Sequence, residues 1–173
     1  MKKVVFLDFD GVINGGWNKK KGGPSGFDWS IPEAVANLNS LFEKTGAAIV
    51  VSSSWRQKDH WPADVGILFS LEKQLVKFGL DPKLVNVIGV TPDELYDKDD
   101  YPVARIVEIR HWIKSRKNDV DSFIVIDDQD ITLDTNNCKV RDSEIESRIV
   151  RTETKTGFCD ASLAKAVELL NSN

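Results

Sequence analysis

The amino-acid sequence predicts an α/β fold of three layers, in which a central, mostly parallel sheet of five strands lies between two layers of helices. Three observations lead to this prediction. Short apolar segments recur along the chain, amphipathic helical patterns separate most of them, and an acidic pair directly follows the first apolar segment. Alternation of strands and helices is typical of parallel sheets covered on both faces. The expected strands are Lys3–Asp8, Ala47–Ser52, Leu84–Val90, Ser122–Asp127 and Arg148–Thr152.

The first expected strand ends in two acidic residues. Residues 3–14 read KVVFLDFDGVIN, so Asp8 and Asp10 follow an apolar run. Open α/β sheets bind ligands beyond the carboxyl ends of their strands. A carboxylate placed there can attack phosphorus, and a second one can transfer the proton. The chain has 18 Asp, so about two Asp-x-Asp pairs arise by chance. Four occur, but only Asp8/Asp10 directly follows an apolar strand and precedes a glycine.

Residues 14–29 interrupt the alternation of strands and helices. Five glycines and one proline in this segment exclude a regular helix. Because the segment follows directly from the acidic pair, we expect a flap-like loop that overhangs the site. Lys20, in the middle of three consecutive lysines, is a candidate for substrate binding. The alternative is an ordinary solvated loop.

The first helix is predicted by a capping box formed by Ser30 and Glu33. An apolar stripe follows, and Gly46 is expected to end this helix. A second helix is expected over Ile67–Phe78, stopped by Gly79.

The second expected strand runs into a serine-rich stretch, SSSWR over residues 52–56. A hydroxyl and adjacent backbone N–H groups at this edge could hold a phosphoryl oxygen, which makes Ser53 or Ser52 a candidate. Ser54 and Arg56 are further candidates for substrate binding. The alternative is that the serines only begin a loop and cap the next helix.

A third helix, whose apolar face includes Ile106 and Ile109, is opened by Arg105. A cation is needed to balance phosphate and acids, and Arg105 is the preferred residue, with Lys98 second. The alternative is a solvated arginine at a helix start.

The fourth expected strand also ends in acids, Asp127 and Asp128, with Asp130 close behind. Adjacent acids after a buried run are costly unless they are paired or bind a metal. Oxygen ligands without nearby His or Cys favour magnesium. The alternative, a helix-capping Asp beside a solvated one, is disfavoured by the acids at the first strand end. Further on, Asp160 is expected to cap the last helix.

Composition indicates a single domain over residues 1–173. A net charge of −4 with 29% charged residues does not indicate nucleic-acid binding, although it does not exclude a local basic patch. No apolar run reaches the length of a membrane span, and the two Cys and two His show no zinc spacing. Because no secretory signal is recognisable, we expect reduced thiols and a cytoplasmic location.

Four motifs occur in the order found in the haloacid dehalogenase (HAD) superfamily of phosphohydrolases, which the chain resembles over nearly its whole length. They are Asp8-Phe-Asp10-Gly-Val, a serine after the second strand, a basic residue opening a later helix, and Asp127-Asp128 after the fourth strand. The SSSWR stretch, followed later by Arg105-Ile-Val-Glu-Ile, is most similar to a small branch associated with RNA repair proteins. The resemblance implies a Rossmann-like sandwich.

The resemblance also implies a Mg²⁺-dependent phosphatase that acts through an aspartyl-phosphate. Asp8 would be the nucleophile, and Asp10 would protonate the leaving alcohol and then activate water. Ser53, or Ser52, would bind the phosphoryl group, and Arg105 stands where the family has lysine or arginine. The implied metal ligands are the Asp8 carboxylate, the Asp10 backbone carbonyl and Asp128, with Asp127 in support.

Larger members of this superfamily carry a cap domain, which we do not expect here. Only about 16 loop residues precede the first helix, and roughly 30 residues, mostly helical, separate the second and third strands. An open site suits a large substrate such as a nucleotide or nucleic-acid end. The alternatives are a small-metabolite phosphatase and a catalytically idle binding module. A receiver domain is disfavoured, because its acceptor Asp would follow the third strand, whereas the acids here follow the first and fourth. Dinucleotide-binding and P-loop proteins are disfavoured because neither of their glycine motifs occurs.

Overall fold

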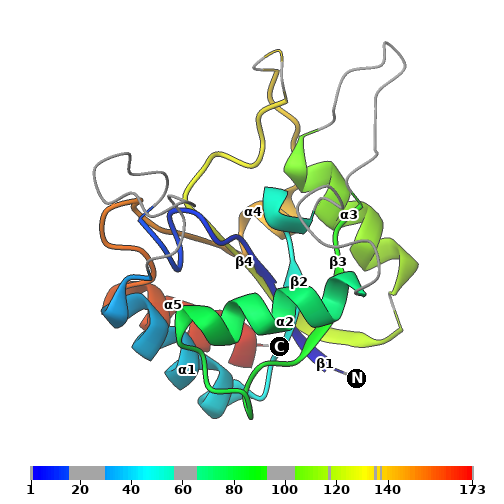
Figure 1. Cartoon of the computed structure of the whole chain (residues 1–173). Helices are drawn as coiled ribbons and strands as arrows, with labels where there is room; N and C mark the ends of the chain where they lie inside the picture. The colour runs from blue at the N-terminus through cyan, green and yellow to red at the C-terminus, as the bar shows by residue number, and fades with distance from the viewer. Residues whose placement is uncertain are drawn as a thin grey trace.

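A computed structural model describes residues 2–15, 30–56, 66–92, 104–116, 118–134, 136 and 138–172. Its centre is a sheet in the order β3-β2-β1-β4-β5, in which every neighbouring pair is parallel (Figure 1). The α/β fold class and its five-stranded parallel sheet are therefore confirmed. The strands are β1 (Lys2–Leu7), β2 (Ala48–Val51), β3 (Val87–Val90), β4 (Val120–Asp127) and β5 (Ile149–Arg151).

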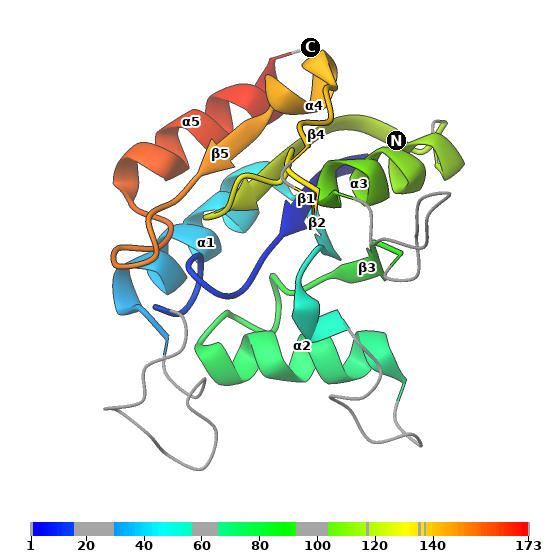
Figure 2. The same cartoon turned by 90° about the horizontal axis from the view of Figure 1, so that it is seen from above.

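Helices cover both faces of the sheet, so the three layers are confirmed as well. One apolar core joins the sheet to three helices, and a second core lies on the opposite face, where Figure 2 shows α3. The first core contains α1 (Pro32–Thr45), α2 (Ile67–Phe78) and α5 (Asp160–Asn171); the second contains α3 (Arg105–Ser115) and the short α4 (Ser143–Glu146).

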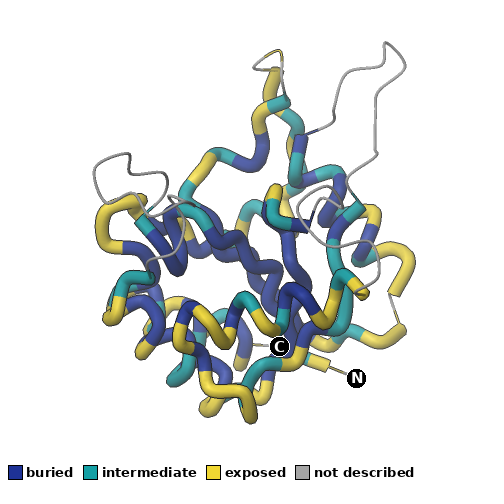
Figure 3. Tube along the Cα trace, in the orientation of Figure 1, coloured by how far each residue is buried: buried dark blue, intermediate teal, exposed yellow. Residues whose placement is uncertain are grey.

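Strand β1 shows why the sheet is buried on both faces. Val5 and Leu7 belong to the first core, Val4 and Phe6 belong to the second, and all four are fully buried. A strand covered on both faces reads as a continuous apolar run rather than an alternating one. Figure 3 shows this buried centre beneath more exposed helices.

Two predicted helix caps are wrong by one residue. Helix α1 begins at Pro32 with Ile31 as its N-cap, and no side chain caps it. Proline favours the first helical position, so the residue before it takes the cap position instead of Ser30. In α5 the N-cap is Cys159, and Asp160 is the first helical residue. There its charge still favours the positive end of the helix dipole.

Other helix boundaries agree with the sequence. Helix α2 spans the predicted residues, and Gly46 and Gly79 end their helices in the left-handed conformation with φ of 62° and 109°. Helix α3 begins at Arg105 as expected. A 3-10 turn, η2 (Ser54–Arg56), and α4 were not predicted, because three or four residues give no periodicity.

The strand order places a crevice beside β1. The chain adds β2 and β3 on one side of β1 and then β4 and β5 on the other. The loops that leave β1 and β4 therefore diverge at their carboxyl ends, which is where such sheets bind ligands. No described helix is both long and apolar enough to cross a membrane.

Candidate active site

Three carboxylates meet at this crevice. Asp8 follows β1, Asp127 ends β4, and Asp128 is the next residue. One carboxylate oxygen from each lies within 4.8 Å of the others. Neighbouring parallel strands present their carboxyl ends at one edge, so residues more than a hundred positions apart come together.

Asp8 is buried, with 3% of its surface exposed. Its backbone N–H donates to the Ile126 carbonyl at 3.0 Å, which continues the β1–β4 pairing past the end of β1. The pKa of Asp8 is raised to about 7, mainly because the carboxyl is buried. The negative charge of Asp127 also raises this pKa, whereas the positive charge of Arg105 and a hydrogen bond with the Ser53 side chain lower it. Neighbouring cations and hydrogen-bond donors are therefore needed to keep this carboxylate ionised.

Arg105 lies beside two of these carboxylates. Its Nη1 lies 2.5 Å from Asp127 Oδ2 and 3.4 Å from Asp8 Oδ2. Burial alone would lower the pKa of Arg105. The negative charges of Asp8 and Asp127 outweigh this effect and raise the pKa, so the guanidinium stays charged. Burial raises the pKa of Asp127. The positive charge of Arg105 and the hydrogen bond from the Gln129 N–H lower it, but they do not outweigh the effect of burial.

Asp128 is oriented by two contacts that the sequence analysis did not find. Thr154 Oγ1 donates to Asp128 Oδ2 at 2.7 Å. Gly11 lies so close that a Cβ there would be 2.1 Å from the same oxygen, and its φ is +74°. The other oxygen, Asp128 Oδ1, is buried and has no hydrogen-bond partner among the described residues. An acceptor held in this way fits a metal ligand.

Asp10 lies apart from the three clustered carboxylates. Its Oδ1 accepts from Asn14 Nδ2 at 2.9 Å, and its Oδ2 accepts from Trp55 Nε1 at 3.1 Å. The Trp55 ring packs against Phe9 and Phe78, with centroids 5.8 and 5.7 Å away. The indole therefore has both a packing role and a role in holding Asp10.

The serine stretch contributes Ser53. Ser53 is fully buried and its side chain hydrogen-bonds Asp8, so the two side chains are neighbours. Ser52 is also buried, with its hydroxyl unpartnered among the described residues. Ser54 is exposed at the start of η2.

Arg56, which the sequence predicts to bind substrate, is engaged by other protein groups. Its side chain is 7% exposed and forms an ion pair of 2.7 Å with Glu108 of α3. Its Nη1 also donates to the Ser53 carbonyl at 2.9 Å. Because protein groups engage the guanidinium, the geometry favours a role in fixing the Ser53 loop. Lys20, Lys98 and most of the expected flap-like loop lie outside the described residues.

One residue that the sequence prediction missed could have been found from its spacing along a helix. Glu108 is three positions after Arg105 and so lies on the same side of a helix. No sequence pattern points to Thr154, because its contact with Asp128 depends on how the chain turns after β5.

Comparison with known families supports the reading of these motifs. Residues 4–163 match the model described as the HAD domain in Swiss Army Knife RNA repair proteins. Comparisons with curated proteins and with solved structures gave no match. HAD membership suggests a phosphatase-type hydrolase, and such domains typically use Mg²⁺. The match spans nearly the whole chain, so the chain belongs to the family of HAD domains found in Swiss Army Knife RNA repair proteins.

Proposed function

We propose that the chain is a Mg²⁺-dependent phosphomonoester hydrolase that acts through an aspartyl-phosphate on Asp8. The observation that supports this most directly is the position of Asp8. It lies beside Arg105 and Ser53 and within one cluster with Asp127 and Asp128.

In the first step, an Asp8 carboxylate oxygen attacks phosphorus while the ester P–O bond breaks. Asp10 donates its proton to the departing oxygen, so that the leaving group is an alcohol. Asn14 and Trp55 hold one Asp10 oxygen each, which fixes the direction of that proton transfer.

In the second step, Asp10 takes a proton from a water molecule that attacks the same phosphorus. The bond from phosphorus to Asp8 breaks, inorganic phosphate leaves, and both carboxyl groups return to their starting states. One residue thus serves as acid and then as base.

The cationic and polar groups stabilise the charge on the phosphoryl oxygens. Arg105 offers a guanidinium beside Asp8, and Ser53 offers a hydroxyl and the adjacent backbone N–H groups. Preorganised donors of this kind usually contribute the largest part of such catalysis. Arg56 supports them by fixing the Ser53 carbonyl to α3 through Glu108.

The site residues fit magnesium. Asp8, Asp127 and Asp128 are hard oxygen donors, and Asp128 Oδ1 is buried without a partner among the described residues. We assign Asp8 and Asp128 as ligands, together with the Asp10 carbonyl, and Asp127 as a support held by Arg105. When bound, the ion would neutralise negative charge on the transferred phosphoryl group.

The proposed substrate is a nucleotide or the terminal phosphate of a nucleic acid. The family description, which refers to RNA repair proteins, supports this class. The alternative is a small phosphorylated metabolite. We also propose that no cap domain covers the site, so that a large substrate can enter, and that Lys20 contacts it.

Substituting the nucleophile tests the mechanism. Asp8→Asn should lower p-nitrophenyl phosphate turnover by several powers of ten, because an amide cannot act as the anionic nucleophile. Asp121→Asn is the matched control, since this residue is exposed and belongs to the opposite half of β4. Turnover by Asp8→Asn above about a tenth of wild type would exclude the assignment.

Substrate class is tested with a 3′- or 5′-phosphorylated oligonucleotide beside sugar phosphates and phosphopeptides, with and without EDTA. Preferred turnover of the oligonucleotide in Mg²⁺ supports the proposal. Turnover of small phosphates alone would favour the metabolite phosphatase. Binding without turnover of any of them would identify an idle module.

A further inference from the structure

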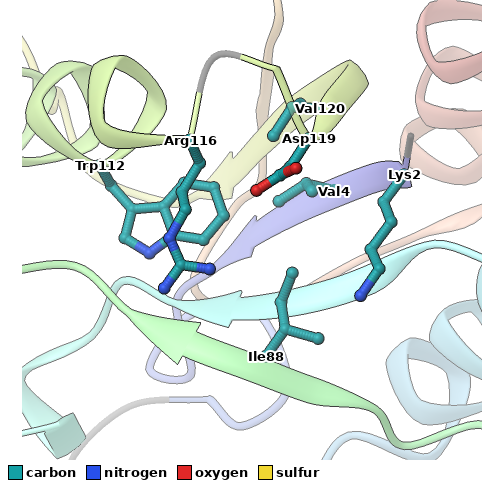
Figure 4. A pocket seen from close by; sticks show the side chains of 7 residues that line it. All are labelled: Lys2, Val4, Ile88, Trp112, Arg116, Asp119 and Val120. Atoms are coloured by element: carbon teal, nitrogen blue, oxygen red, sulfur yellow. The ribbon is translucent and has the colours of Figure 1, made fainter.

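A cavity of about 250 Å³ adjoins the candidate active site beside the start of α3. Its lining residues come from η2, the first turn of α3 and the loop after β4: Ser54, Arg56, Arg105, Glu108, Gln129, Asp130, Ile131 and Leu133. Arg105 is shared with the candidate active site, where its Nη1 lies 3.4 Å from Asp8 Oδ2. The larger cavity shown in Figure 4, near the amino ends of the strands, has no residue of that site in its lining. A substrate whose phosphate binds beside Arg105 can therefore reach the first cavity and not the second.

The turn η2 links this cavity to Asp10. Trp55 Nε1 donates to Asp10 Oδ2 at 3.1 Å, and the residues on either side of Trp55 both line the cavity. In the proposed mechanism, Asp10 protonates the departing oxygen of the substrate. The part of the substrate that carries this oxygen would therefore lie near η2, within reach of the cavity.

The size and the lining of the cavity favour one sugar over a base. Sites that hold a whole drug-sized ligand usually measure about 300–1,000 Å³, so this cavity suits only part of a substrate. Six of its eight lining residues are polar or charged, and none of these described residues is aromatic. A base would have no ring to stack on here, whereas sugar hydroxyls would meet hydrogen-bond donors and acceptors.

Asp130 presents a carboxylate oxygen that is available to a ligand. Its Oδ1 accepts hydrogen bonds from the Thr132 N–H at 3.1 Å and from Thr132 Oγ1 at 2.5 Å. Within the described part of the chain, no donor bonds to Oδ2, and Asp130 belongs to no ion pair. The residue is only half-buried and its neighbour Gln129 is exposed, so this side of the cavity is accessible. A carboxylate repels phosphate but accepts a hydrogen bond from a neutral hydroxyl.

We propose that this cavity binds the ribose of the substrate and that Asp130 Oδ2 accepts a hydrogen bond from the 2′-hydroxyl. Ile131 and Leu133 would contact carbon atoms of the sugar ring, and the exposed Ser54 and Gln129 offer further polar groups. The chain would thus prefer ribonucleotides to deoxyribonucleotides, because the 2′-hydroxyl is the group by which a protein distinguishes them. This specificity rests on the proposed phosphatase function, since the ribose is part of the substrate that Asp8 attacks.

The test compares adenosine 5′- and 3′-monophosphate, each with its 2′-deoxy counterpart, by release of phosphate in Mg²⁺. Wild-type kcat/KM should favour the ribonucleotide by about tenfold in at least one pair, which is ~1.4 kcal/mol and modest for a hydrogen bond to a charged group. Asp130→Ala should remove most of this preference. Asp130→Asn can keep both bonds from Thr132 and should show an intermediate preference, because a neutral amide binds a hydroxyl more weakly. A disturbed loop would slow both members of a pair alike, so the ratio reports the hydroxyl contact.

The matched control is Asp134→Ala, which should retain the wild-type preference. Asp134 lies in the same loop and its Oδ1 accepts from the N–H groups of Asn136 and Cys138, but it does not line the cavity. Loss of the preference in this control as well would contradict the assignment of Asp130.

The possible outcomes separate the ribose contact from the phosphatase function. If p-nitrophenyl phosphate is hydrolysed but neither pair shows a preference, or Asp130→Ala keeps it, the ribose contact is overturned and the phosphatase proposal stands. If no phosphate is hydrolysed, p-nitrophenyl phosphate included, both are overturned. Ribose 5-phosphate and 2-deoxyribose 5-phosphate form a third pair. A preference confined to that pair, and lost in Asp130→Ala, would support the ribose contact and assign it to a small sugar phosphate.

Discussion

The Asp8 carboxyl is buried, yet the proposed mechanism requires it to be ionised in order to attack phosphorus. Burial raises its pKa to about 7, whereas Arg105 and Ser53 favour the charged form. An anion buried without such partners would take up a proton instead. In the proposed mechanism, these neighbouring groups therefore have a second role besides binding phosphate, because they favour the ionised form of Asp8.

Substitution of Asp10 tests its role as general acid. Asp10→Asn should slow hydrolysis of alkyl phosphates far more than of p-nitrophenyl phosphate, by a further factor of about 10²–10⁴. Nitrophenolate leaves without a proton, whereas an alkoxide does not. The measurement is kcat for both substrates, with Asp121→Asn as the control. An equal decrease for both substrates would contradict the assignment.

Individual site residues were predictable to different degrees. The sequence pointed to Asp8, Asp127 and Asp128 because buried apolar runs precede them, and the structure brings these three together. The sequence singled out Arg105 as the cation because it opens a helix near the fourth strand, and the structure places its Nη1 3.4 Å from Asp8 Oδ2. The partners Asn14 and Thr154 were not predictable, because their contacts depend on loop conformations that have no sequence period.

At the scale of elements, α3 supplies two charged residues to the candidate active site and the loop beside it. Arg105, Glu108, Trp112 and Arg116 follow one another at spacings of three and four, so they lie along one side of the helix. The first contacts Asp8, the second pairs with Arg56, and the guanidinium of the last lies over the Trp112 ring. Glu108 is 8% exposed, and its buried carboxylate is compensated by the ion pair with Arg56.

Helix α4 depends on its cap. Asp142 Oδ1 accepts from the Ile145 N–H at 3.1 Å, and its Oδ2 contacts Arg110 Nε. Burial raises the pKa of Asp142, but the hydrogen bond from Arg110, the N–H groups of α4 and the Arg110 charge outweigh it, so this pKa lies below its ordinary value. A lowered pKa in the folded state stabilises the protein above the unfolded pKa, and this contribution is lost as the pH falls below about 4.

Asp142→Asn should therefore destabilise the protein by roughly 1 kcal/mol at pH 7 and by less at pH 3, because the contribution is lost as the pH falls through the folded-state pKa. Asparagine still caps the helix, so only the charge is removed. Urea unfolding at several pH values measures the difference. In an Arg110→Gln background the same change should have little effect at either pH. A loss of stability independent of pH would show that the charge is irrelevant.

Elements were predicted best where they are long and periodic. Helix α2 has the predicted bounds because its stripe and Gly79 act together. The third strand begins at Val87 rather than Leu84, because residues 82–84 form a turn in which the Leu84 N–H bonds to the Asp81 carbonyl. Apolar character alone does not distinguish such a turn from a strand.

At the scale of the whole molecule, metal binding should stabilise the fold. A ligand that binds only the folded state at a hundred times its Kd adds about 2.7 kcal/mol. For a chain of this size that corresponds to a rise in Tm of roughly 5–10 °C. We expect such a rise with Mg²⁺ in the wild type, measured by calorimetry against NaCl of equal ionic strength.

Asp128→Ala should abolish most of that rise, whereas Asp121→Ala should leave it unchanged. This readout does not depend on activity, so it separates metal binding from catalysis. An undiminished rise in Asp128→Ala would assign the ion to other ligands.

The position of β1 in the middle of the sheet affects how the chain folds during synthesis. β1 ends at Leu7, but its partner β4 begins only at Val120. At ribosomal rates of about 5–20 residues per second, the first strand waits roughly 5–25 s for that partner. One edge of its apolar run, VVFL, stays unpaired in the meantime even after β2 has paired with the other edge, and an open strand edge is a template for aggregation. The yield of folded protein should therefore depend on synthesis rate, temperature and chaperones more strongly than its final stability would suggest.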